Sequence, residues 1–255
     1  IWENRPSLPA NPVEIQPLEY AGETLASKVA RIRKSLRELH ADGMLVSALD
    51  DIAWTLNLRG TDVHCNPVFV SYLLIESDKV SLFVDDNKLS PEVKQYLQDN
   101  QVSLYKYNKV EKCLESYSEY NILLDGDETS YYLWKAVKCQ EIVAAASPIP
   151  AMKAVKNEAE IEGYRSAMLK DGVAMVKFLK WLKPAVEAGG QTEISIDEKL
   201  TSLRAEQKLF RDISFDTIAG YAQHGAIVHY EATPETDVVL KPEGLILIDS
   251  GAQCQ

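Results

Sequence analysis

"SPIPAMKAVKN", residues 147–157, separates two parts of the sequence whose hydrophobic patterns differ. Its prolines, Pro148 and Pro150, disfavour helical conformation at the residues that precede them. Asn157, at the end of the stretch, is a preferred residue for the N-cap of a helix. We therefore expect one domain to end near residue 150 and a long helix to begin at Asn157.

Residues 23–150 alternate between helical and strand patterns. From Thr24 to His40 apolar residues recur every three or four positions, which predicts an amphipathic helix with Thr24 as its cap. The runs "PVFVSYLLIE" (67–76) and "KVSLFVD" (79–85) predict neighbouring strands joined by a short turn. Strands that alternate with helices in this way indicate a compact α/β domain over residues 23–150.

Two shorter segments of this first part, residues 49–60 and residues 1–22, are expected to form a short helix and an extended chain. "LDDIAWTLNLRG" (49–60) predicts a short helix that ends at Gly60, since glycine is the usual residue after a helix C-terminus. Residues 1–22 contain four of the eleven prolines, which predicts extended chain and no helix. We interpret residues 1–22 as a linker that follows a missing N-terminal domain.

Residues 151–255 begin with helices and end with strand-like runs. The long helix from Asn157 is expected to end at Pro184 and the pair Gly189–Gly190. Ser195 and Glu198 predict a capping box at the start of a second helix. Three strand-like runs follow, "ISFDTIAG" (213–220), "AIVHYEA" (226–232) and "GLILIDSG" (244–251). This order indicates an α+β domain whose sheet has only begun to form.

The composition limits the classes of function. Apolar residues make up 46% and charged residues 25% of the 255 residues, as in an ordinary globular protein. A formal net charge of −11 argues against non-specific binding of nucleic acid or of an anionic membrane, because both need fields of Lys and Arg. The four cysteines form no CxxC pair and are expected to be reduced and mostly buried. Without an apolar membrane span or a signal-like start, a cytoplasmic protein is expected.

Asp249 and His229 are the candidate functional residues. An apolar strand that ends in Asp249-Ser250-Gly251 can place a carboxylate at the edge of a sheet, although Asp249 can equally begin a turn, which the pattern alone favours. His229 can act as a general acid or base or donate a hydrogen bond to a substrate carbonyl. Alternatively, it is a histidine at a strand end whose hydrogen bonds are satisfied within the protein and which has no catalytic role. His224 is expected to be a turn residue. Histidine pairs with HExxH spacing, Gly-rich phosphate loops and GxSxG motifs are absent from the sequence.

Several separate stretches resemble one family, the Xaa-Pro aminopeptidases (aminopeptidase P), which have the pita-bread metallopeptidase fold. Residues 48–75 ("ALDDIAWTLNLRGTDVHCNPVFVSYLLI") are similar to the creatinase-like middle domain of the three-domain form. Residues 151–174 ("AMKAVKNEAEIEGYRSAMLKDGVA") resemble the start of its catalytic domain. The stretches 214–236 ("SFDTIAGYAQHGAIVHYEATPET") and 245–253 ("LILIDSGAQ") resemble the first catalytic strands.

The resemblance implies a role for both candidate residues. Asp249, in "DSGAQ", corresponds to a ligand of one of two divalent metal ions, commonly Mn²⁺, and His229 to a residue that contacts the substrate near the scissile carbonyl. Relatives supply four further metal ligands beyond the point where this chain ends, at Gln255. The resemblance therefore implies a fragment, the middle domain and the truncated start of the catalytic domain, that is inactive in isolation and binds no metal tightly.

The expected parent enzyme is a homodimer that cleaves peptides with proline at the second position. A fitted pocket is needed because the X–Pro bond is a tertiary amide without an N–H. Two alternatives remain open at this point. The chain could belong to a creatinase-like relative that is not a peptidase, or it could be a stand-alone module for binding or dimerisation.

Overall fold

The computed structural model describes residues 3–255, which divide into two compact units, one up to Glu160 and one over residues 161–255. Residues 1 and 2 lie outside the described part. The first unit is called unit 1 and the second unit 2.

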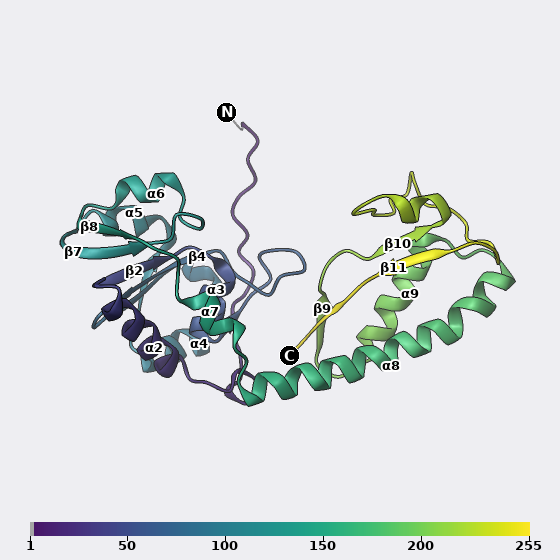
Figure 1. Ribbon diagram of the computed structural model, residues 1–255, viewed down its shortest axis with the longest axis horizontal. Coiled ribbons are helices and arrows are strands. Elements are labelled where there is room, and N and C mark those ends of the chain that lie inside the picture. Colours follow the sequence, from purple (N-terminus) through teal and green to yellow (C-terminus); the bar gives the residue numbers. More distant parts are fainter. Residues whose placement is uncertain (1–2) are drawn as a thin grey trace. The chain divides into compact units, whose positions relative to one another are not determined.

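Unit 1 is built on one six-stranded sheet with the strand order β6-β5-β4-β2-β7-β8 (Figure 1). Its strands are β2 (Gly43–Val46), β4 (Ser71–Glu76), β5 (Val80–Val84), β6 (Val102–Lys106), β7 (Tyr117–Leu124) and β8 (Cys139–Ala144). Strand β4 runs antiparallel to both β2 and β5, and the other neighbours are parallel. The two expected strands at 67–76 and 79–85 are confirmed as β4 and β5.

Helices cover both faces of this sheet. They are α2 (Leu25–Glu38), α3 (Leu49–Leu56), α4 (Pro91–Asp99), α5 (Val110–Leu114), α6 (Tyr131–Ala136) and α7 (Ile149–Ala154). Side chains alternate along a strand, so Met44 and Val46 of β2 enter one core, with α2, α3 and α4, while Leu45 enters the other, with α5 and α6. Figure 1 shows α5 and α6 on one side of the sheet and α2, α4 and α7 on the other. The expected α/β fold of residues 23–150 follows from this alternation.

The N-terminal segment of unit 1 is ordered against the rest of the unit. Strand β1 (Glu14–Ile15) pairs antiparallel with β3 (Leu58–Arg59), and the side chain of Val13 is buried. Residues Leu18–Ala21 form the short helix α1, which ends at Gly22 with a positive φ of 67°. The expectation of extended chain without helix is therefore wrong for this stretch. That residues 1–22 connect to a preceding domain stays a prediction.

Two expectations about where helices end are wrong, one of them only in part. Helix α3 ends at Asn57, which takes the left-handed conformation (φ 51°, ψ 45°), and Gly60 lies beyond β3. The Asn57 side chain stabilises this ending, because it accepts from Lys28 and donates to the carbonyl of Glu23. Helix α8 (Glu158–Ala188) ends directly before the pair Gly189–Gly190, as expected, but Pro184 lies inside it and does not end it. A proline bends a helix without necessarily ending it.

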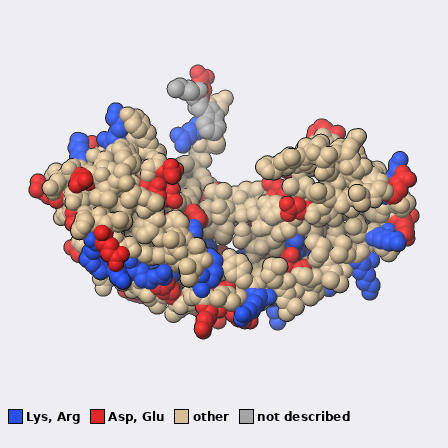
Figure 2. Space-filling view, viewed as in Figure 1, with Lys and Arg blue, Asp and Glu red and all other residues tan. Residues whose placement is uncertain are grey.

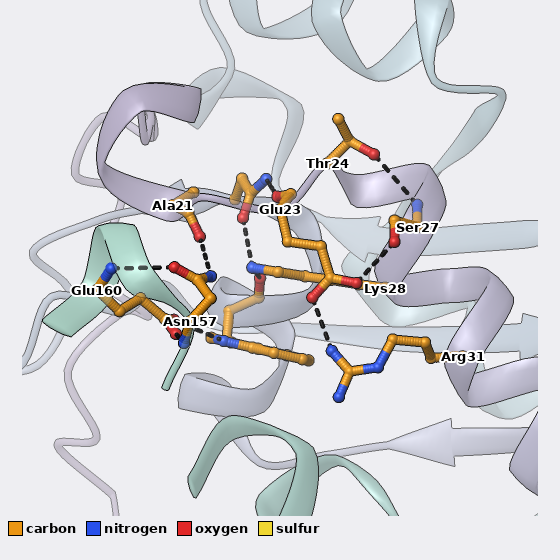
Figure 3. Close-up of polar contacts among 10 residues, drawn as sticks. Ala21, Glu23, Thr24, Ser27, Lys28, Arg31, Asn157 and Glu160 are labelled. Carbon is orange, nitrogen blue, oxygen red and sulfur yellow. Dashed lines mark hydrogen bonds and ion pairs between the residues drawn. The ribbon is translucent and has the colours of Figure 1, made fainter. Parts of the chain in front are cut away.

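The stretch 147–157 contains helix α7 and then the expected cap. Asn157 Oδ1 accepts from the Glu160 N–H at 3.0 Å, and Glu160 Oε2 accepts from the Asn157 N–H at 2.9 Å. Asn157 Nδ2 also donates to the carbonyl of Ala21 at 2.9 Å (Figure 3). The cap at Asn157 is confirmed, and it ties the start of α8 to the N-terminal segment.

Unit 2 contains most of α8, helix α9 (Glu193–Ala205) and two antiparallel strand pairs. Strand β9 (Phe210–Ile213) pairs with β12 (Ala252–Cys254), and β10 (Ile218–Tyr221) pairs with β11 (Ile246–Asp249). The expected strand at 226–232 is absent, because residues Ala222–Ala226 form the 3₁₀ helix η3 and a turn follows. The capping box of α9 joins Thr192 and Ser195, where Ser195 and Glu198 were expected.

Several side chains are more exposed than their pattern predicts. In α8 only Ala174, Phe178 and Val186 are buried, whereas Met168 is 70% exposed. The visible face of unit 2 carries few charged side chains (Figure 2).

None of the four cysteines forms a disulfide within residues 3–255, and all are partly exposed, so the expectation of mostly buried thiols is wrong. No helix in this range combines the length and apolar character that crossing a bilayer requires.

Candidate active site

Asp249 lies at the end of β11, on the exposed side of the β10–β11 pair. It stands opposite Ile218 of β10 in the antiparallel register. Because side chains alternate along a strand, Ile246 and Ile248 pack against the core of unit 2, while Leu247 and Asp249 are exposed. The strand therefore presents the carboxylate to solvent. Gly251 follows where a Cβ would collide with the Ser214 side chain.

His229 lies in the segment between β10 and β11, outside any strand. Its backbone has a positive φ of 55°, and the residue is exposed to solvent. Its neighbours differ sharply, since Val228 is 82% exposed and Tyr230 only 7%. Between residues 3 and 255 the structure records no hydrogen bond or ion pair that links His229 to Asp249. Both candidate residues thus belong to unit 2.

A buried carboxylate, that of Glu193, collects three donors beside His229. Oε1 accepts from the Tyr221 N–H at 2.6 Å, and Oε2 accepts from the Tyr230 hydroxyl at 2.7 Å. His224 Nδ1 lies 2.9 Å from Oε1 and 3.1 Å from Oε2. The rings of His224 and Tyr230 pack together, with centroids 4.6 Å apart. Glu193 itself is fully buried, at 0% exposure.

The chemistry of the donors fixes the protons in this cluster. A carboxylate oxygen can only accept, so His224 donates from Nδ1, which assigns the tautomer of a neutral ring. Burial raises the pKa of the Tyr230 hydroxyl, which therefore keeps its proton and donates. His224 was expected to be a turn residue. It does lie in the short helix η3, and it also bonds the buried carboxylate.

Two family models match consecutive parts of the chain. The creatinase/prolidase N-terminal domain matches residues 4–160, which is more than half of the chain, and metallopeptidase family M24 matches residues 162–255. The chain belongs to the creatinase/prolidase family. The boundary between the two matches coincides with the division into unit 1 and unit 2.

Known relatives match along nearly the whole chain. A probable Xaa-Pro aminopeptidase P of Arthroderma benhamiae is 37% identical over 99% of this chain and 38% of its own length. Xaa-Pro aminopeptidase 1 of Dictyostelium discoideum is 37% identical over 98% of this chain and 40% of its own length. The chain thus spans about two fifths of the curated relatives that it matches.

Solved structures confirm the pita-bread class of fold. The X-prolyl aminopeptidase of Caenorhabditis elegans, described as a cytosolic enzyme with a di-nuclear active site, aligns over 99% of this chain and 43% of its own. Its TM-score is 0.93 at 30% identity. The Xaa-Pro dipeptidase of Bacillus anthracis, at 17% identity and a TM-score of 0.68 over 90% of this chain and 61% of its own, supports the fold alone.

Asp249 is the carboxylate of the M24 region that the sequence singled out for a metal ion. Oxygen ligands suit Mn²⁺, and the exposed Asp249 supplies them at the end of β11. Taken one unit at a time, within residues 3–160 or 161–255, no three His, Cys, Asp or Glu side chains converge on a common point. Asp249 therefore fits the chemistry of a metal ligand but supplies only one of the several that a hydrolytic site needs.

Sequence reasoning missed Glu193. An acidic residue at the start of a helix is normally explained by the helix dipole, which hides any other role. Yet Glu193 shares a stripe with Ile196, Leu200 and Leu203, spaced by three and four residues, and all four side chains are buried. A carboxylate in the buried stripe of an amphipathic helix was the signal that could have identified it.

Proposed function

We propose that this chain is part of an Xaa-Pro aminopeptidase, an enzyme that releases an N-terminal residue from a following proline. The observation that carries the proposal is 37% identity to proteins of that name over 98–99% of the chain. The match to family M24 over residues 162–255 supports the same class of enzyme. The non-peptidase relative and the stand-alone module have no comparable support.

Two residues of this chain are assigned to the reaction. Asp249 is proposed as a ligand of one of two divalent metal ions, with Mn²⁺ as the proposed metal. Such ions, when bound, acidify a water molecule and polarise the scissile carbonyl. His229 is proposed to contact the substrate near that carbonyl, where an exposed imidazole can donate a hydrogen bond or exchange a proton. The exposure of both side chains is compatible with these assignments.

The proposal also covers the location, the oligomeric state and the partners of the enzyme. A cytoplasmic location is proposed because the C. elegans relative is described as a cytosolic enzyme. A homodimer is proposed for the whole protein. Its partners are peptides with proline in the second position, and a net charge of −11 disfavours nucleic acid and anionic membranes as partners.

The test is an assay of the full product of the gene with Xaa-Pro and Xaa-Ala peptides, before and after chelation and with Mn²⁺ restored. We expect hydrolysis of the Xaa-Pro peptide only, and only with metal. Asp249→Asn should lower kcat/KM by more than about a hundredfold, since even partners of metal ligands are worth roughly ten- to hundredfold. Glu235→Gln, at an exposed carboxylate of the same unit, is the matched control.

Two results would contradict the proposal. Equal hydrolysis of Xaa-Ala and Xaa-Pro peptides would refute the substrate class, and full activity of Asp249→Asn would refute its role as a ligand. The 255 residues alone should show no activity and no tight binding of two ions, because Asp249 is one ligand where several are needed. Metal-dependent hydrolysis by those residues alone would refute that expectation.

A further inference from the structure

The segment that presents His229, residues 222–229, is held at both ends by one side chain. Tyr221 immediately precedes it and donates its backbone N–H to Glu193. Tyr230 immediately follows it and donates its hydroxyl to the same carboxylate. Within the segment, His224 donates from Nδ1. Glu193 is therefore a common anchor for the start, the middle and the end of the His229 segment.

The backbone of the His229 segment needs such an anchor. Ala222 and His229 both have positive φ, at 50° and 55°, although neither is glycine. This left-handed conformation is disfavoured for an L-residue, because its Cβ lies too close to the following carbonyl oxygen. The chain also folds back closely on β10, where a Cβ at Gly220 would lie 2.8 Å from the backbone nitrogen of Gly225. Two backbone hydrogen bonds, from Ala222 to the carbonyl of Leu245 and from Ile227 to that of His224, also hold this segment, but only Glu193 bonds its start, middle and end together.

Glu193 is itself held rigidly. It is the first residue of α9, directly after Thr192, whose hydroxyl accepts from the Ser195 N–H at 3.2 Å and caps the helix. The start of a helix favours a negative charge. A buried carboxylate that receives three donors is well satisfied, whereas an amide in its place keeps only one accepting oxygen and turns the other into a donor, so one of the three donors loses its acceptor. The anchor is therefore both fixed in place and specific to a carboxylate.

We propose that Glu193 is a positioning residue that acts through His229, by holding the His229 segment in the conformation that presents the imidazole to the substrate. Glu193 does not touch the substrate in this proposal. Its effect on catalysis passes through His229 and therefore rests on the proposed function. Its effect on the backbone of residues 221–230 is independent of any activity.

The first experiment measures the anchor itself in the full gene product. Hydrogen–deuterium exchange of peptides that cover residues 221–230 is compared between wild type, Glu193→Gln and Glu198→Gln. Glu198 lies on the same helix and is exposed, so it is the matched control. We expect faster exchange in this segment for Glu193→Gln alone, with α8 unchanged. Should Glu193→Gln fail to fold, Tyr230→Phe removes one donor and carries the same test with a smaller effect.

The second experiment is a double-mutant cycle on the peptidase. Glu193→Gln should lower kcat/KM by roughly ten- to hundredfold through misplacement of His229, with unchanged metal content. In a His229→Ala background the same change should have almost no further effect, because the group through which Glu193 acts is already gone. A general structural defect would lower activity by the same factor in both backgrounds.

The outcomes separate the two proposals. Unchanged exchange in residues 221–230 overturns the anchor. Faster exchange with additive effects of Glu193→Gln and His229→Ala overturns the action through His229. If the wild-type protein hydrolyses no Xaa-Pro peptide, the proposed function and the catalytic role of Glu193 fail together. In that case faster exchange would still establish Glu193 as the anchor of the segment.

Discussion

Unit 1 and unit 2 bury their apolar residues to very different degrees. In unit 1 both faces of a six-stranded sheet are covered, and two core clusters fill the space between sheet and helices. In unit 2 the β10–β11 pair and α9 share one smaller cluster with α8. Apolar side chains such as Met168, Leu169 and Leu245 are 70%, 72% and 84% exposed there.

This difference shows that the hydrophobic periodicity of a sequence does not determine the free energy of unfolding of the folded unit. Both parts have helical and strand periodicity, but the hydrophobic effect stabilises a fold only through the apolar area that is removed from water, by about 25 cal/mol per Å². Unit 1 therefore has a large reserve of stabilising burial, and unit 2 a small one. We expect unit 2 to open first and unit 1 to define the final unfolding transition.

The largest expected effect compares two fully buried phenylalanines, one in each unit. Phe83 of β5 and Phe178 of α8 are each 0% exposed. Truncation of a buried phenylalanine to alanine costs about 3–5 kcal/mol. Phe83→Ala should lower the free energy of unfolding of unit 1 by that amount and leave it folded, whereas Phe178→Ala should unfold unit 2. Hydrogen exchange at increasing urea reports the two units separately.

Val176→Ala, at a residue of α8 that is 66% exposed, is the control for the phenylalanine pair and should change the free energy of unfolding little. If Phe178→Ala leaves unit 2 as protected from exchange as in the wild type, unit 2 is not the less stable of the two units. If the loss of protection stays confined to residues 161–255, the difference in stability between the units is supported.

A second effect depends on pH and concerns unit 1 alone. Lys28 of α2, labelled in Figure 3, is 1% exposed. It donates to the carbonyl of Trp54 at 2.8 Å and to Asn57 Oδ1 at 2.7 Å. Burial lowers the pKa of Lys28 from its ordinary 10.5 to about 8, and the charge of Glu160 opposes this shift. Between those two values the unfolded chain holds a proton that the folded chain has released. The stability of unit 1 should therefore rise with pH over this window, by at most about 3 kcal/mol.

Lys28→Met tests this pH dependence. The variant keeps an unbranched apolar side chain and cannot titrate, so the rise in the free energy of unfolding between pH 8 and 10.5 should be smaller than in the wild type. Lys34→Met, on the same helix at a side chain that is 73% exposed, controls for the general loss of a lysine. Parallel pH curves for the wild type and Lys28→Met would show that Lys28 stays charged in the folded chain.

How far the sequence predicts this molecule depends on whether a feature is local. The strand alternation of unit 1, the caps Thr24 and Asn157 and the delivery of Asp249 by an apolar strand are all written in short patterns, and the structure has each of them. The end of α3 at Asn57 was missed because its stabilising partners, Lys28 and Glu23, lie 29 and 34 positions away in the chain.

The candidate site shows the same limit more strongly. "AIVHYEA" has the alternation of a strand, but Glu193 holds the neighbouring chain in a turn by bonds that span 28 to 37 residues. No pattern within residues 226–232 contains that information. The carboxylate in the buried stripe of α9 was visible in the sequence, yet its partners were not, because they depend on how β10 and η3 fold back on the helix.

The smallest expected effect compares two equivalent helix caps. Thr24 caps α2 of unit 1 and Thr192 caps α9 of unit 2, and each hydroxyl accepts from the N–H three residues later at 3.2 Å. Loss of such a cap costs about 1 kcal/mol. Thr24→Ala should lower only the free energy of unfolding of unit 1, and Thr192→Ala only that of unit 2, as measured by exchange in α2 and α9.

Serine at each position keeps the accepting oxygen, so Thr24→Ser and Thr192→Ser should restore most of the loss and separate the cap from other effects of the substitution. The pair also decides whether the two units unfold independently. If each alanine variant lowers the protection of both units equally, the chain unfolds as one cooperative body, and the smaller core of unit 2 is then stabilised by its coupling to unit 1.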